Sequence, residues 1–144
     1  MTRRARVYVA HPIVTYGTAR ERDCLAVLRE QLPGVELYDP AGRYRREHGW
    51  QRAWPKVLAS LSGLVVFGAK DGTIGTGCLR ELTDALAWGL PVAGLGGDVL
   101  KEIGGVQLLP VPWRTARHVG RLVLGDPIEP RDFLVLQPNE RTAP

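Results

Sequence analysis

One segment of the chain, residues 71–92, combines residue types that could do chemistry. It reads DGTIGTGCLRELTDALAWGLPV, so that a run of glycine and threonine opens directly into a helical pattern. Such a loop allows close approach of a ligand and presents unpaired backbone N–H groups, which attract phosphate or another anion. The candidate ligand-binding residues of this loop are Gly72, Thr73, Gly75, Thr76 and Gly77.

Glu81 is the candidate reactive carboxylate. It stands four positions after Gly77, beside an expected buried stripe of Leu79, Leu82 and Leu86. The helix dipole favours its ionised form by about 0.3–1 kcal/mol. That effect suits an anionic nucleophile and suits an ordinary glutamate at a helix start equally well, so position alone leaves both readings open.

The glycine loop differs from two common nucleotide-binding motifs. The phosphate-binding loop of ATPases requires a following Gly-Lys-Ser/Thr, which is missing here. The G-x-G-x-x-G spacing of dinucleotide sites is also absent. ATP hydrolysis and hydride transfer are therefore disfavoured.

Strand and helix patterns alternate along the chain. Strands are expected at 5–10, 35–38, 63–67, 92–95 and 106–109. Helices are expected from Thr18, whose capping box pairs it with Glu21, to Pro33, then at 54–61, 77–89, 97–103 and 113–124. Residues 132–136 are either a last edge strand or a docking arm. This alternation predicts an α/β protein, a three-layer α/β/α sandwich with a mostly parallel sheet of about five strands.

Length and composition indicate a single domain over residues 1–144, with 1–4 and 139–144 loosely ordered. The chain is 44% hydrophobic and 24% charged, and no apolar run reaches the roughly 18 residues of a membrane span. With no signal-peptide core at the N-terminus, we expect a cytoplasmic protein without membrane partners.

Cysteine and histidine placement gives no sign of a metal site or a bound cofactor. Cys24 and Cys78 fall on apolar helix stripes and are expected to be buried free thiols. His11, His48 and His118 are far apart in the sequence and lack ligands at metal-binding spacing.

The net charge of +4 is carried largely by arginine. Arginine suits phosphate or carboxylate, so an anionic small molecule is one interpretation and a solvated basic surface is the other. Nucleic acid is disfavoured as a partner because aromatic and basic residues do not alternate along a strand face.

The segment from Gly77 to Val92 resembles the glutamate helix of nucleoside 2-deoxyribosyltransferases and their nucleotide N-glycosidase relatives. The intervals between Glu81, Ala85, Gly89, Pro91 and Val92 agree with that family. The first strand, Val-Tyr-Val-Ala at 7–10 followed by His-Pro at 11–12, is also similar to the family's opening Tyr-x-Gly/Ala-x-Pro segment. The resemblance covers about residues 6 to 95.

This resemblance implies a flavodoxin-like or Rossmann-like domain, usually a homo-oligomer. The family's glutamate attacks the anomeric carbon of a nucleoside, releases the base, and passes the sugar to another base or to water. Carried over, Glu81 becomes the nucleophile and Tyr8 the group that orients it. Retaining glycosyl transfer needs such a carboxylate to form the covalent intermediate.

The chain departs from the family where acids assist the leaving base. The family has an Asp at the start of strand three, where this chain has Ser62-Gly63, and a second Asp six residues before the glutamate, where this chain has Gly75. Asp71 is the substitute proton donor, unless it only forms an Asx turn ahead of Gly72.

Other residues can bind substrate on this reading. His11, with Pro12 beside it, either contacts the sugar or phosphate or is a structural loop histidine. Arg43, Arg46 and Trp50 are either a flap, with an aromatic wall for the base and arginines for a 5′-phosphate, or an exposed basic loop with a packing tryptophan.

Three functions remain open from the sequence. The first is cleavage or transfer of the N-glycosidic bond of a nucleoside or its 5′-monophosphate. The second is a phosphoribohydrolase of the cytokinin-activating type, whose Gly-Gly-x-Gly-Thr-x-x-Glu loop fits poorly here because Glu81 is five residues after Thr76. The third is a non-catalytic nucleotide-binding sensor on the same scaffold.

Overall fold

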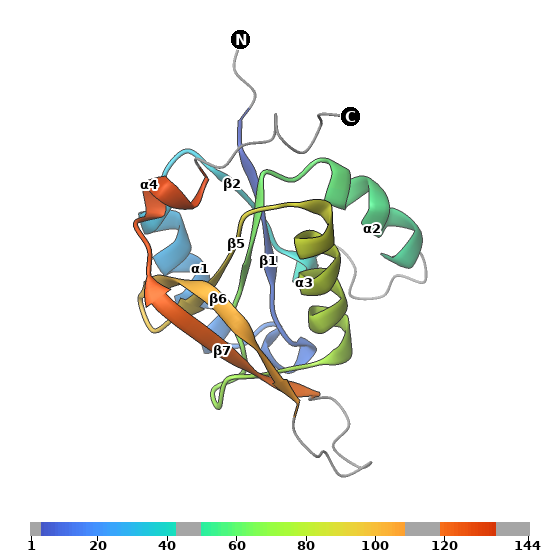
Figure 1. Cartoon of the computed structure of the whole chain (residues 1–144), viewed down its shortest axis with the longest axis vertical. Coiled ribbons are helices and arrows are strands. Elements are labelled where there is room, and N and C mark those ends of the chain that lie inside the picture. The colour runs from blue at the N-terminus through green and yellow to red at the C-terminus, as the bar shows by residue number, and fades with distance from the viewer. Residues whose placement is uncertain (1–3, 43–49, 109–118, 135–144) are drawn as a thin grey trace.

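The computed structural model describes residues 4–42, 50–108 and 119–134, and it is an α/β structure built on one mixed seven-stranded sheet (Figure 1). The strand order is β2-β1-β3-β5-β6-β7-β4. The strands are β1 (Arg6–Ala10), β2 (Glu36–Tyr38), β3 (Gly63–Val66), β4 (Thr73–Ile74), β5 (Val92–Gly96), β6 (Val99–Leu108) and β7 (Gly120–Pro127). The helices are α1 (Ala19–Gln31), α2 (Trp50–Ala59), α3 (Thr76–Trp88) and α4 (Pro130–Phe133), with 3-10 turns η1 (Ile13–Thr15) and η2 (Pro40–Gly42).

Strands β2, β1, β3 and β5 form the parallel half of the sheet, as the sequence predicts. Side chains alternate along β1, so Val7 and Val9 face one hydrophobic cluster while Tyr8 and Ala10 face another. Apolar residues of α1 and α4 complete the first cluster, and those of α2 and α3 complete the second. Helices therefore lie against both faces of the sheet, as Figure 1 shows.

The prediction of a mostly parallel sheet is wrong, because β6 and β7 add an antiparallel hairpin and β4 pairs antiparallel with β7. The expected short helix at 97–103 is part of this hairpin. Gly96 pairs with Val99, which leaves Gly97 and Asp98 as a two-residue turn, and Gly97 has φ +62°. A glycine with positive φ at the first position of a two-residue turn suits a hairpin, and the pairing of β6 with β5 selects the hairpin over the helix.

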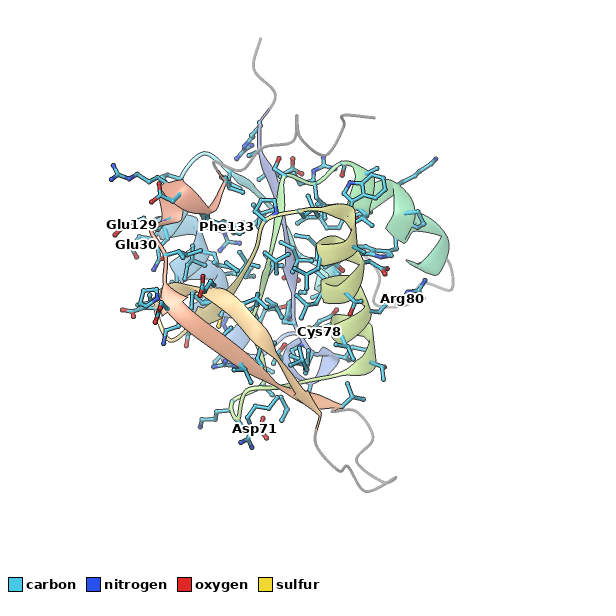
Figure 2. All side chains as sticks on the ribbon, in the orientation of Figure 1. Glu30, Asp71, Cys78, Arg80, Glu129 and Phe133 are labelled. Atoms are coloured by element: carbon cyan, nitrogen blue, oxygen red, sulfur yellow. The ribbon has the colours of Figure 1, made fainter. Side chains whose placement is uncertain are left out.

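The two remaining C-terminal predictions also change. The helix expected at 113–124 is strand β7 from Gly120 onward, whereas 113–118 lie outside the described residues. Of the two readings of residues 132–136, the edge strand is wrong in the described part, because α4 begins at Pro130 and its Phe133 packs in the core beside α1. Residues 135–136 lie outside the described residues. Figure 2 shows Phe133 of α4 lying inward, at the same end of the molecule as Glu30 of α1.

The terminal segments 1–3 and 139–144, expected to be loosely ordered, fall outside the described residues. Within the described ranges, every helix is too short or too polar to cross a bilayer. Cys24 and Cys78 are buried free cysteines, as the sequence predicts.

Candidate active site

Glu81 and Tyr8 meet at the packed interface between α3 and β1. The Tyr8 hydroxyl donates a hydrogen bond to Oε2 of Glu81, and 5% of Glu81 and none of Tyr8 is exposed. Tyr8 points toward α3 because strand alternation puts it on that face of the sheet. The structure thus joins two of the three residues to which the sequence assigns catalytic roles.

The buried stripe of α3 explains why Glu81 points inward. Its buried residues are Cys78, Glu81, Leu82 and Ala85, at the spacing of one helix face, so the carboxylate is part of the core-facing side. The expected stripe of Leu79, Leu82 and Leu86 is wrong at Leu86, which is exposed. Cys78 lies between α3 and the sheet in Figure 2.

Burial dominates the electrostatics of Glu81. It raises the pKa of the carboxyl to about 8; the hydrogen bond from Tyr8 lowers the pKa and the nearby charge of Asp84 raises it. Asp84 itself accepts a hydrogen bond from Trp54 Nε1 at 2.8 Å and lies 3.8 Å from Arg80 Nε. Burial therefore keeps the Glu81 carboxyl largely protonated at neutral pH.

Aromatic rings surround Tyr8, and the sequence reading did not single them out. Tyr38 stacks on Tyr8 with ring centroids 5.7 Å apart, and Trp54 meets it edge-on at 5.0 Å. Tyr16, half-buried after η1, has its pKa raised by burial and by the charges of Glu81 and Asp39. The one sequence signal for this neighbourhood is the alternation of side chains along β1, which turns Tyr8 toward the face that the buried stripe of α3 covers.

His11 lies in a second polar cluster, which sequence reasoning missed. Its Nε2 is 2.8 Å from Asp39 Oδ1 and 3.4 Å from Glu21 Oε2, and its Nδ1 is 2.6 Å from Thr15 Oγ1. Because β1 and β2 are parallel neighbours, the residues that follow them, His11 and Asp39, come to the same edge of the sheet. The ring stacks on Phe67, 4.6 Å away.

The two carboxyls beside His11 shift in opposite directions. Burial raises the pKa of Glu21, and Asp39 raises it further, although the Gly17 N–H and His11 lower it. Burial alone would raise the pKa of Asp39, but hydrogen bonds from His11 and Ala41 hold it below its usual value. His11, of which 2% is exposed, therefore belongs to a buried polar cluster. The Pro12 carbonyl oxygen supports the cluster by accepting a hydrogen bond from Thr15 Oγ1, 2.6 Å away.

The glycine segment mostly builds structure. The Asp71 carboxylate accepts from Thr73 N at 3.1 Å and from Thr73 Oγ1 at 2.6 Å, which is the Asx turn, and Figure 2 places Asp71 at the lower end of the molecule. Gly72, at φ +86°, donates to Ala69 and accepts from Leu122, so its backbone is used in the turn and in pairing with β7. Gly75 is the N-cap residue of α3, and Gly77 has open space around it.

Part of the predicted substrate flap lies outside the described residues, namely Arg43 and Arg46. Trp50 begins α2. A groove lined by Arg4, Arg29 and Glu36 opens at the amino ends of β1 and β2, the sheet edge opposite His11, so it is separate from these clusters.

Comparisons with protein-family models, with curated proteins and with solved structures find no match to this chain. Any functional assignment therefore depends on the residues and geometry described above.

Proposed function

We propose that this protein cleaves or transfers the N-glycosidic bond of a nucleoside or nucleoside 5′-monophosphate, with Glu81 as the nucleophile. The observation that carries the proposal is the buried Glu81 carboxyl held by the Tyr8 hydroxyl against the first strand. These are the two residues to which the resemblance to the deoxyribosyltransferases assigns the nucleophile and the group that orients it.

The chemistry follows from the pair. With Oε2 held by Tyr8, Oε1 attacks the anomeric carbon, the bond to the base breaks with its electron pair leaving on the base nitrogen, and a glycosyl ester forms on Glu81. A second base, or water, then attacks the same carbon and frees the carboxylate. The departing base takes up one proton from solvent, because Asp71, the donor expected from the sequence, lies in an Asx turn with Thr73 at the lower end of the molecule.

The nucleophile must be ionised to react. With a pKa of about 8, about a tenth of the Glu81 carboxyls are ionised at pH 7. The hydrogen bond from Tyr8 favours that ionised form, so the hydroxyl both orients the carboxylate and increases its population.

We further infer a three-layer sandwich of the Rossmann-like type, assembled as a homo-oligomer. Helices on both faces of a parallel β2-β1-β3-β5 half support the first inference. The exposed Leu86 and Trp88 side chains of α3 support the second. A binding site for the base and 5′-phosphate is proposed around the α3 N-terminus at Thr76 and Gly77, both exposed. On the sequence alone, Arg43, Arg46 and Trp50 are further proposed ligands of that substrate.

A non-catalytic nucleotide-binding role is the second candidate. It is favoured by the burial that keeps Glu81 mostly protonated at neutral pH, and by Ser62-Gly63 and Gly75 at positions where the family has acids.

The test is incubation with a panel of nucleosides and nucleoside monophosphates, with and without a second free base, followed by chromatography of the bases. Release from monophosphates alone assigns a nucleotide hydrolase, and exchange without release assigns a transferase. Glu81→Ala should abolish either activity, with Glu30→Ala, an exposed glutamate of α1, as the control. Binding without turnover by the wild type would contradict catalysis and favour the sensor.

A further inference from the structure

The hydrogen bonds of His11 fix which ring nitrogen is offered to the carboxylates. Thr15 Oγ1 donates its proton to the Pro12 carbonyl at 2.6 Å, so this oxygen accepts from the His11 Nδ1–H at 2.6 Å. The other nitrogen, Nε2, then faces the Glu21 and Asp39 carboxylates. The hydrogen bond to Asp39 uses a proton on this nitrogen, and a metal ion would take the place of that proton on the Nε2 lone pair.

Three ligand atoms come together around one point. His11 Nε2 is 2.8 Å from Asp39 Oδ1 and 3.4 Å from Glu21 Oε2, and all three residues offer atoms within 4.8 Å of one another. Ligands at about 2.0–2.1 Å from a tetrahedral Zn²⁺ lie roughly 3.3–3.5 Å apart. The histidine and Glu21 already have this separation, and the Asp39 contact needs to widen by about half an ångström.

Glu21 supplies an independent sign that a ligand belongs here. Its residue is 8% exposed, yet its Oε2 is buried without a hydrogen-bond partner among the described residues, and this oxygen is the one aimed at His11. A buried acceptor left unpaired costs about 1–3 kcal/mol, more when charged. A cation between Glu21, Asp39 and Nε2 would pair it.

The surrounding hydrogen bonds resemble those that support metal ligands in proteins. The Gly17 N–H donates to Glu21 Oε1 at 3.0 Å, which directs Oε2 toward the cluster. The Ala41 N–H donates to Asp39 Oδ1 at 3.0 Å, and Thr15 holds the second nitrogen of His11. Such outer contacts fix the orientation of metal-binding side chains.

We propose that His11, Glu21 and Asp39 bind one divalent first-row metal ion, of which Zn²⁺ fits the spacing. One imidazole and two carboxylates suit Zn²⁺, Mn²⁺ or Fe²⁺, whereas Mg²⁺ and Ca²⁺ prefer oxygen ligands throughout. Three protein ligands leave a fourth position for water or a ligand. The metal site does not use Glu81 or Tyr8, and it takes His11, of which 2% is exposed, as a metal ligand in place of the sugar contact expected from the sequence.

The test is calorimetric titration of the full untagged chain, stripped with chelator, with Zn²⁺. We expect one ion per chain, with binding weakened at least tenfold in Glu21→Gln and in Asp39→Asn. Glu30→Gln, an exposed glutamate in the last turns of the same helix, should bind as the wild type does. Thermal unfolding gives a second readout, since Zn²⁺ should raise the Tm of the wild type and of Glu30→Gln but not of Glu21→Gln.

Glu21→Gln should remain folded, because the amide keeps the shape of the side chain and offers an N–H to Asp39. Circular dichroism without metal checks this. Absence of Zn²⁺ binding by the wild type would overturn the proposal. The cluster would then be held by its hydrogen bonds and ion pairs alone. Equal affinity in the wild type and in both cluster variants would also overturn it, since the ion would then bind elsewhere.

Discussion

At the scale of single residues, the ionised form of Glu81 that would react as a nucleophile also lowers the free energy of unfolding. The carboxyl of the unfolded chain loses its proton near the ordinary value of 4.5, whereas in the folded state it keeps the proton until about pH 8. Between these values the unfolded chain binds fewer protons, so the free energy of unfolding falls as pH rises. At 1.36 kcal/mol per pH unit, the loss reaches on the order of 4–5 kcal/mol by pH 8.

Glu81→Gln removes this titration and should reverse the penalty. We expect the free energy of unfolding of the variant, minus that of the wild type, to increase by several kcal/mol from pH 5 to pH 8. Urea denaturation at pH 5, 6.5 and 8 measures it, with Glu30→Gln as the exposed control on α1. Parallel stability curves for wild type and variant would show that Glu81 ionises normally in the folded protein.

Tyr8→Phe tests the hydrogen bond that favours ionised Glu81. Loss of the hydroxyl should raise the pKa of Glu81 further, since this hydrogen bond lowers it. If Glu81 is the nucleophile, kcat/KM of the wild type rises with pH through about 8, and in the variant it is lower by roughly 10- to 100-fold with its midpoint at higher pH. A wild-type rate that falls through pH 8 would instead identify Glu81 as a general acid.

At the scale of elements, Leu124 of β7 lies directly against Gly94 of β5. A Cβ added to Gly94 would meet Leu124 Cδ2 at 2.1 Å, with Cγ and Cδ1 both at 3.2 Å, so Leu124 must move. Gly94→Ala should therefore reduce the free energy of unfolding by about 1–3 kcal/mol. Denaturation measures this loss, and the double variant with Leu124→Ala should lose less than the two single changes added together.

Gly77→Ala is the matched control for that experiment. Gly77 lies in the first turn of α3 with nothing within 4 Å of an added Cβ, so alanine should leave stability unchanged or raise it by up to about 1 kcal/mol. If Gly94→Ala were equally harmless, Leu124 would not be held against Gly94 and the predicted clash would be wrong.

At the scale of the whole molecule, local patterns predicted the parallel half of the sheet and missed the antiparallel half. The βα units from β1 to β5 carry continuous apolar strands and clear helix caps, such as Thr18, which accepts from the Glu21 N–H. In the C-terminal third, one turn decided the outcome. Gly97 and Asp98 can begin a helix or close a hairpin, and only pairing with β5 favours the hairpin.

The candidate site divides in the same way. Glu81 and Tyr8 were paired by the resemblance of their segments to the deoxyribosyltransferases, and they are in contact. His11, Glu21 and Asp39 could not be grouped from spacing, because they are brought together only when β1 and β2 pair and α1 begins beside them. Asp71 shows the limit of residue type as a guide, since an aspartate before glycine is also the residue that forms an Asx turn.

The most direct test of the central claim is to trap the glycosyl ester on Glu81. The wild type would be mixed with a nucleoside or monophosphate from which it releases base, quenched in acid, and examined by intact-protein and peptide mass spectrometry. We expect one added sugar, or one sugar 5′-phosphate when the substrate is a monophosphate, on the peptide that contains Glu81, and none in Glu81→Gln. Base release with no adduct on that peptide, together with undiminished turnover by Glu81→Gln, would contradict it.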